Sequence, residues 1–155
     1  LEIAKSAGVQ TILHPAPAAD LPEGLLALCD YITPNETEAE ALTGISVSTV
    51  SDAEKAADQL HQMGVKTPII TLGEKGAFLH GYGLVNSFEV APVVETTGAG
   101  DAFNGGFAAA LSEGQTPLEA VIFGCAAAGI SVTRPGTAPS MPIRSEIEKV
   151  IITRK

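Results

Sequence analysis

The sequence predicts an α/β fold centred on a mainly parallel sheet. Short apolar runs alternate with helical patterns along the first part of the chain, which is the order that parallel βαβ units produce. Near the middle, several short runs follow one another without a helix and indicate a short antiparallel part. The chain has 155 residues, 45% of them hydrophobic, so one domain can bury a substantial core.

The first part of the chain predicts short strands, loops and one longer helix. Gly8 stops an initial helix, and the prolines between residues 14 and 22 break regular structure there. Pro34 halts a buried strand, and Gly44 closes the helix that follows. In order, we expect a helix end at 1–7, a strand at 9–13, a helical turn at 25–28, a strand at 31–33 and a helix at 36–42.

The middle of the chain predicts one helix followed by strands. Ser51 and Glu54 have the spacing of a capping box, so a helix is expected to open there and to end at Gly64. Its buried face is formed by Ala53, Ala56, Ala57 and Leu60. The expected strands after it lie at 67–72, 77–80, 83–86 and 88–94, with a glycine turn at 73–76.

The last part of the chain predicts three helices, at 100–112, 117–132 and 145–152. Apolar residues share one face of the first helix: Phe103, Phe107, Ala110 and Leu111. The second helix is expected to bury a single stripe, made of Leu118, Val121, Ile122, Cys125 and Val132.

Composition and charge exclude several classes of function. The net charge of −9 argues against a nucleic-acid or anionic-membrane surface. No apolar run approaches 18 residues and no signal-peptide pattern is present, which favours a cytoplasmic protein. Cys29 and Cys125 are isolated and read as reduced thiols, and the three histidines do not have the spacing of a zinc site.

The turn formed by Gly98, Ala99, Gly100 and Asp101 feeds directly into a helix and predicts an anion site. The N–H groups at a helix start point outward, and the helix dipole adds about half a positive charge there. Asp101 at such a site has two interpretations. It is an ordinary first-turn acid that stabilises the helix, or it is a base placed next to a bound phosphoryl group.

Two better-known phosphate-binding motifs are excluded. The pattern Gly-x-x-x-x-Gly-Lys-Ser/Thr of the P-loop does not occur in the chain. The dinucleotide fingerprint requires a third glycine where Phe103 stands, which disfavours an oxidoreductase. What remains is a cradle for a phosphoryl group with a carboxylate beside it, an arrangement suited to phosphoryl transfer to an alcohol.

Residues 96–107 read Thr-Thr-Gly-Ala-Gly-Asp-Ala-Phe-Asn-Gly-Gly-Phe, which resembles the second signature of the ribokinase (PfkB) family of sugar kinases. Segments 14–18, 33–40, 71–76 and 132–136 are similar to other family motifs and follow in the family's order. The resemblance covers nearly the whole chain. It implies a ribokinase-like, Rossmann-like three-layer α/β domain.

Compared with the family, residues 1–155 resemble the C-terminal, nucleotide-binding part of one such domain. The chain begins at Leu1 without a methionine, and its first residues read as the middle of a helix. We therefore expect a fragment without the N-terminal strands and the small β lid. In the family those parts carry most of the sugar-binding residues.

The resemblance implies an ATP-dependent kinase that phosphorylates the primary hydroxyl of D-ribose. Asp101 would be the general base, and the amides of Ala99, Gly100 and Asp101, helped by Gly98, would stabilise the transferring phosphoryl group. The segments 14–18 and 35–40 favour ribose. Kinases for fructose, a nucleoside or another small alcohol are alternatives, as is a truncated, non-catalytic nucleotide-binding half. The resemblance also leaves a homodimer open.

Asn35 and Glu38 lie at a predicted strand-to-helix junction, where open α/β sheets collect ligands. From the residues alone, Asn35 caps the helix and Glu38 is a first-turn acid. In the family, this Asn-x-x-Glu pattern is associated with the phosphates of ATP and its Mg²⁺. One carboxylate suffices for Mg²⁺, because this ion keeps most of its waters.

By resemblance, residues 71–76, an expected strand end and the turn after it, border the nucleotide. Its residues are Thr71, Leu72, Gly73, Glu74, Lys75 and Gly76. Read without the family, the segment is a β-turn and Lys75 is a solvated surface residue. By resemblance, Cys125 stands where the family often has a histidine or asparagine near the adenine. The helical pattern alone makes it a core residue.

Members of the family that resemble ribokinase hold K⁺ beside the anion site, mostly through carbonyl oxygens. Carried over residue by residue, the ligands are Glu95, Thr97, Ser131, Arg134, Gly136 and Ser140. Arg134 would contribute its carbonyl group. Glu95 departs from the usual aspartate, and its extra methylene moves the carboxylate.

Overall fold

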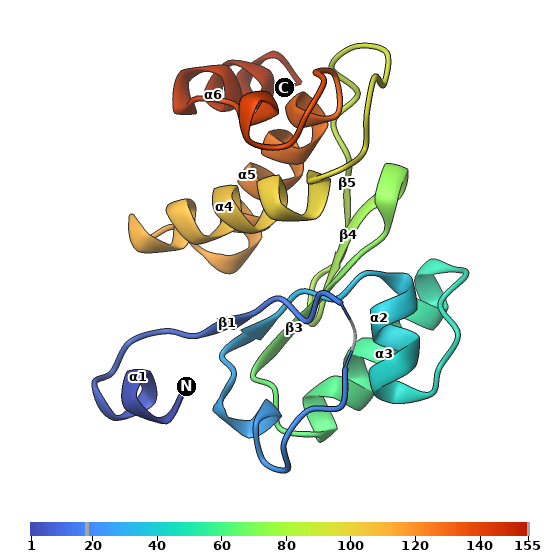
Figure 1. The fold of residues 1–155 in the computed structure, drawn as a ribbon, viewed down its shortest axis with the longest axis vertical. Coiled ribbons are helices and arrows are strands. Elements are labelled where there is room, and N and C mark those ends of the chain that lie inside the picture. Colours follow the sequence, from blue (N-terminus) through green and yellow to red (C-terminus); the bar gives the residue numbers. More distant parts are fainter. Residues whose placement is uncertain (18, 155) are drawn as a thin grey trace. The chain divides into compact units, whose positions relative to one another are not determined.

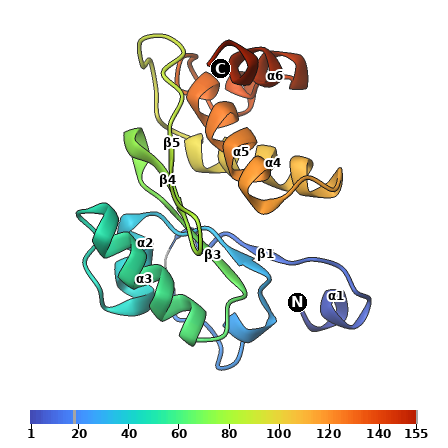
Figure 2. The same ribbon diagram turned by 180° about the vertical axis from the view of Figure 1, so that it is seen from behind.

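The structure is a computed structural model that describes residues 1–17 and 19–154 (Figures 1 and 2). The chain forms two compact units. The first unit contains residues 1–73 and 77–84, and the second contains residues 74–76 and the chain from Val85 onward. The predicted single domain over 1–155 stays a prediction. The predicted α/β class is confirmed.

Five short strands form one mixed sheet in the order β1-β2-β3-β4-β5. The strands are β1 (Ile12–Leu13), β2 (Tyr31–Ile32), β3 (Thr67–Thr71), β4 (Gly76–Leu79) and β5 (Gly83–Asn86). Ile12 of β1 pairs with Tyr31 of β2, and Tyr31 pairs with Thr67 of β3, both in parallel register. β4 pairs with β3 in antiparallel register. The predicted parallel start and antiparallel middle are therefore both present.

The first unit adds three helices and a 3-10 turn to these strands. They are α1 (Glu2–Ser6), the turn Leu26–Leu28, α2 (Glu36–Thr43) and α3 (Val50–Gln62). Figure 2 shows α2 and α3 side by side next to the strands, and α3 packs against β3. The predicted face of α3 is confirmed, because its three alanines and Leu60 are fully buried. Ala39, Ile70, Leu72 and Phe78 complete the core on that side.

Two predictions for the first unit need correction. The strand expected at 9–13 is limited to Ile12–Leu13, and Val9 is exposed. The capping box lies at Thr49 and Asp52, two residues before the predicted pair. The hydroxyl of Thr49 accepts from the Asp52 N–H at 3.2 Å, and the Asp52 carboxylate accepts from the Thr49 N–H at 3.1 Å. The chain offers two overlapping patterns of this spacing, and the earlier one opens the helix.

The second unit is built on three helices (Figure 1): α4 (Ala99–Ser112), α5 (Pro117–Ser131) and α6 (Arg144–Thr153). α4 and α5 approach closely at two glycines. A Cβ atom on Gly124 would lie 2.9 Å from Phe103, and one on Gly106 would lie 3.0 Å from Ala127 Cβ. Glycines inside helices lower helix propensity, so these two serve the close approach that holds α4 in place.

Two predictions for the second unit were wrong. Residues 88–94 form no strand; instead, Phe88 packs on α5, where a Cβ atom on Gly129 would lie 2.4 Å from the Phe88 carbonyl oxygen. Pro92 removes a backbone donor from this segment. The stripe expected on α5 is too narrow, because the buried residues surround the helix. Val121 and Cys125 are buried, whereas the other three, Leu118, Ile122 and Val132, are only partly buried.

No helix in the described part of the chain is both long enough and apolar enough to span a bilayer. The two cysteines are free and buried.

Candidate functional site

The glycine turn at the start of α4 requires glycine for two separate reasons. Gly98 is the N-cap residue and has a φ of 82°, in the left-handed region. A Cβ atom on Gly98 would also lie 3.2 Å from Thr137 Cγ2. A side chain there would meet both backbone strain and a neighbouring loop. The predicted turn is therefore fitted closely to the loop that contains Thr137.

Four other helices, α2, α3, α5 and α6, also have an acid at their third residue, and α4 begins differently from the first three. In α2, α3 and α5 the N-cap is an asparagine or a threonine, and its side chain accepts from the N–H of that acid. Each of those acids in turn accepts from the N–H of the N-cap residue. Gly98 has no side chain to do this, so the N-cap of α4 makes no side-chain cap hydrogen bond. In α6 the N-cap is Ile143, which makes no side-chain cap hydrogen bond either.

Asp101 is the third residue of α4 and is exposed to solvent. The start of this helix carries outward N–H groups and partial positive charge, as predicted. One of the predicted phosphoryl donors has a different role in this structure, because the Ala99 N–H donates to the Thr96 carbonyl at 3.1 Å. The turn thus combines a carboxylate with a helix start that lacks a side-chain cap, which is the chemistry required to bind an anion beside a base.

The loop before α4 is bound to the loop after α5. The carbonyl oxygen of Val132 accepts from the N–H groups of Val94 at 2.8 Å and Glu95 at 3.2 Å. Further along, the Glu95 Oε2 atom accepts from the Gly136 N–H at 2.8 Å. The Gly136 N–H, followed by the Thr97 hydroxyl, lowers the pKa of Glu95. The carboxylate is therefore ionised at neutral pH.

The predicted K⁺ ligands all lie in the second unit, on these two loops and at the end of α5. Ser131 is buried, and its carbonyl accepts from the Arg134 N–H at 3.2 Å. Ser140 is also buried, and its hydroxyl donates to the Thr137 carbonyl at 2.6 Å. The donors are carboxylate, hydroxyl and carbonyl oxygens, so the residues fit a hard cation in kind. No described group of three histidine, cysteine or acidic residues forms a metal cluster.

Asn35 and Glu38 lie in the first unit, at the start of α2. The Asn35 Oδ1 atom accepts from the Glu38 N–H at 2.8 Å, and Glu38 Oε2 accepts from the Asn35 N–H at 2.9 Å. Glu38 is 7% exposed. Asn35 forms a bridge with Thr71, so the carboxyl ends of β2 and β3 meet at this helix start. The structure thus places Asn35, Glu38 and Thr71 together, and it also shows the capping interpretation in full.

The segment 71–76 contributes mostly backbone. Leu72 is buried in the core, whereas Gly73, Glu74 and Lys75 form an exposed 3-10 turn. Gly76 must be glycine, since a Cβ atom there would lie 2.1 Å from the Val85 carbonyl oxygen. The turn is a short 3-10 turn, a tight turn of the kind considered from the sequence, and Gly73 and Gly76 have positive φ values of 53° and 111°. It can offer amide and carbonyl groups to a ligand, whereas the Leu72 side chain is committed to the core.

Cys125 lies on α5 and is 4% exposed. Burial raises the pKa of its thiol to about 12. The thiol is therefore neutral and packed, in agreement with its interpretation as a core residue. Its predicted contact with the nucleotide stays a prediction.

A comparison with known families now bears on this arrangement. Residues 1–144 match the model of the pfkB family carbohydrate kinases. The chain belongs to this family. It is 50% identical over 148 residues to a ribokinase of Haemophilus influenzae, which covers 94% of this chain and 48% of that relative. The resemblance drawn from the sequence motifs is confirmed.

Solved structures of the family agree. A ribokinase of Thermotoga maritima has a TM-score of 0.87 and 45% identity, covering 98% of this chain and 52% of that one. The ribokinase of Arabidopsis thaliana, solved with ribose and ATP, has a TM-score of 0.91 and 37% identity. That alignment covers 97% of this chain and 50% of the plant enzyme. The chain therefore spans about half the length of the relatives it matches.

Two features of this pfkB-family chain complete the picture. In segment 14–18, the His14 Nδ1 atom lies 3.3 Å from the Thr33 carbonyl oxygen at the ends of β1 and β2, and Ala18 lies outside the described residues. Thr137, which packs against Gly98, was not expected from the sequence. Its only sequence signal is its place directly after the Pro135-Gly136 turn.

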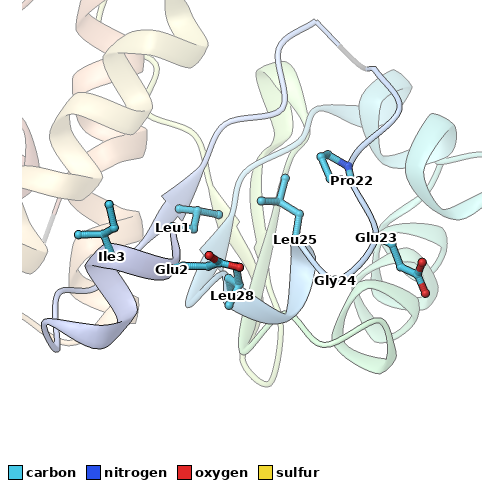
Figure 3. A pocket seen from close by; sticks show the side chains of 8 residues that line it. All are labelled: Leu1, Glu2, Ile3, Pro22, Glu23, Gly24, Leu25 and Leu28. Carbon is cyan, nitrogen blue, oxygen red and sulfur yellow. The ribbon is translucent and has the colours of Figure 1, made fainter.

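The pocket in Figure 3 is separate from all of these residues. It lies in the first unit, and the residues that line it are Leu1, Glu2, Ile3, Pro22, Glu23, Gly24, Leu25 and Leu28. None of the predicted site residues lines it.

Proposed function

We propose that this chain is part of an ATP-dependent sugar kinase that converts D-ribose to ribose 5-phosphate. The observation that carries the proposal is the start of α4, where Asp101 follows a glycine N-cap that leaves the helix without a side-chain cap. The ribokinases among its relatives support the substrate class. The relative solved with ribose and ATP supports the pair of substrates.

In the proposed reaction, Asp101 accepts the proton of the primary hydroxyl as its oxygen attacks the terminal phosphorus of ATP. The bond between that phosphorus and the bridging oxygen breaks, and ADP leaves with the electron pair. The N–H groups at the start of α4 stabilise the negative charge on the transferring group. Gly98 sets their direction through its left-handed conformation.

We assign the other predicted residues to the nucleotide and the ions. Asn35, Glu38 and the turn at 71–76 would face ATP and its Mg²⁺, and Glu38 would act through the metal's waters. The loops around Glu95 and Gly136 would hold K⁺. Mg²⁺ neutralises phosphate charge, and K⁺ would order the loops beside the turn. The two units would belong to one ribokinase-like domain of a cytoplasmic enzyme.

Two alternatives compete with a ribose kinase. A kinase for fructose or a nucleoside would use the same turn, because the turn would act on the attacking hydroxyl and the phosphoryl group, which all these reactions share. A non-catalytic nucleotide-binding half would bind ATP through the same residues and transfer no phosphoryl group.

The test is ADP release by the purified full protein with ATP, Mg²⁺ and K⁺, after its intact mass is measured. D-ribose, D-fructose and adenosine are offered separately. We expect ADP release that depends on D-ribose. Turnover with another alcohol would reassign the substrate. ATP binding without ADP release from any alcohol would overturn the kinase proposal in favour of a nucleotide-binding half.

A further inference from the structure

The hydrogen bond from Gly136 to Glu95 joins two distant parts of the chain. The two residues are 41 positions apart, and the distance from the Gly136 nitrogen to Glu95 Oε2 is 2.8 Å. Both residues belong to the second unit. A carboxylate that accepts from a backbone N–H makes a charge-assisted bond, which is stronger than one between neutral groups. The loop after α5 is thus held by a side chain from the loop before α4.

This contact is the second of two attachments between the same loops. The first is the Val132 carbonyl, which accepts from both Val94 and Glu95. Between the two attachments the chain turns through Arg134 and Pro135, and Gly136 has a φ of 80°. A loop attached at one end pivots, whereas a loop attached at two points has a fixed position.

The fixed position matters because Thr137 follows immediately. Its Cβ and Cγ2 atoms lie within 3.3 Å of the place where a Cβ atom on Gly98 would be. Thr137 therefore packs against the residue whose conformation directs the N–H groups of the turn. Its carbonyl also accepts from the N–H and the hydroxyl of Ser140, which closes the loop on its far side.

We propose that Glu95 is a positioning residue, which fixes the 132–140 loop against the glycine turn through its direct hydrogen bond to Gly136. The positioning acts on the reaction proposed above and rests on it. In this role one carboxylate oxygen, Oε2, accepts from a backbone N–H. This hydrogen bond itself does not require a cation.

The first test is hydrogen–deuterium exchange of the full protein, in buffer without K⁺. In Glu95→Ala, the amides of residues 134–140 and of the turn at 96–101 should exchange about tenfold faster or more, because the bond is lost. In Glu95→Gln the amide oxygen still accepts, so exchange should stay within about threefold of the wild type. The control is Glu119→Ala, whose acid accepts from Thr116 at another helix start and should not affect either segment.

Unchanged exchange at residues 134–140 in Glu95→Ala would overturn the proposal. So would a Glu95→Gln variant that exchanges as fast as Glu95→Ala, together with wild-type exchange that slows only when K⁺ is added, since Glu95 would then act only as a cation ligand. These measurements require no turnover, so they decide the proposal even if the kinase assignment fails.

Kinetics separate positioning from a purely structural role. In Glu95→Ala we expect kcat to fall about tenfold while the KM for ATP changes less than about threefold, because the N–H groups of the turn would act on the transferring phosphoryl group mainly in the transition state. Glu95→Gln should restore kcat. If Glu95→Ala only lowers the amount of folded protein and each folded molecule keeps the wild-type kcat, Glu95 contributes to stability alone. That result would overturn the positioning role.

Discussion

The helices α2 and α4 both have an acid at their third residue, yet the two helix starts are built differently. At α2, Asn35 and Glu38 satisfy each other's backbone N–H groups through a complete capping box. At α4 the N-cap is Gly98, which has no side chain, and the turn is shaped instead by a φ of 82° and by Thr137. The same spacing thus produces a closed helix start in one unit and an uncapped one in the other.

This difference separates what helix capping explains at each helix start from what a ligand would explain. At α2 the hydrogen bonds of a helix start already account for both residues, so a ligand role would be added to a structural one. At α4 the φ of 82° and the nearby Thr137 exclude a side chain at the N-cap, so this helix start lacks the stabilisation that a side-chain cap gives. The sequence retains a less stable helix start where an anion can approach the backbone.

The largest expected effect is at Asp101. Replacing it by Asn retains the shape and removes the base, so kcat should fall by about 10²–10⁴-fold while nucleotide affinity changes little. ADP release at saturating D-ribose measures kcat, and titration with ATP measures affinity.

Glu119→Gln is the matched control, because Glu119 is the third residue of α5 and is part of a capping box. This variant should lose some stability and keep its turnover. If Asp101→Asn also keeps its turnover, the start of α4 is an ordinary helix start and the comparison collapses.

The next effect concerns the contact that holds α4 in place. In Gly124→Ala the new methyl group would lie 2.9 Å from the Phe103 carbonyl oxygen, which cannot move without moving α4. Overpacking of this kind costs about 1–3 kcal/mol of unfolding free energy, against which better helix propensity returns up to about 1 kcal/mol. Urea unfolding of the two variants Gly124→Ala and Gly105→Ala measures the difference.

Gly105→Ala, on the partner helix α4, is the control, since nothing lies within 4 Å of a Cβ atom there. It should stabilise the protein by about 0.5–1 kcal/mol. Equal effects of the two substitutions would show that α4 and α5 are not held by close approach at Gly124.

A smaller effect tests whether Asn35 does more than cap α2. Asn35→Ala should lower the free energy of unfolding by about 1 kcal/mol, and so should Thr49→Ala at the start of α3. Only Asn35→Ala should also raise the KM for ATP if the residue faces the nucleotide. Equal stability losses with unchanged KM in both variants would leave Asn35 as a cap alone.

The sequence predicted the elements with strong local signals. Three features follow from periodicity and turn residues: the buried face of α3, the helix start after Gly98 and the parallel pairing of β1 with β2. The family motifs added the identity of the turn, because a glycine pair followed by an acid is not specific alone.

The errors occurred where long-range packing decides the outcome. Residues 88–94 have strand propensity, but the structure pairs them with no strand and places Phe88 on α5 at Gly129. The contact between Thr137 and Gly98 joins positions 39 residues apart in number, and no local pattern encodes it. The sequence did not predict the hydrogen bond from Gly136 to Glu95 for the same reason, since the two residues are 41 positions apart.

The smallest expected effect is the pH dependence of the closed helix starts. At α5, the Thr116 hydroxyl and N–H lower the pKa of Glu119, so this acid stabilises the folded state when ionised. Because the folded pKa lies below the unfolded value, the contribution is complete above the unfolded pKa and is lost as pH falls through the folded pKa. Glu119→Gln should therefore be less stable than the wild type at pH 7 and equally stable at about pH 3. Urea midpoints at the two pH values measure this, with Glu54→Gln, an exposed position of α3 outside the cap, as the control. A difference in urea midpoint between Glu119→Gln and the wild type that persists at low pH would contradict this expectation. The glutamate would then stabilise α5 through packing, and the closed and uncapped helix starts would differ in shape and not in charge.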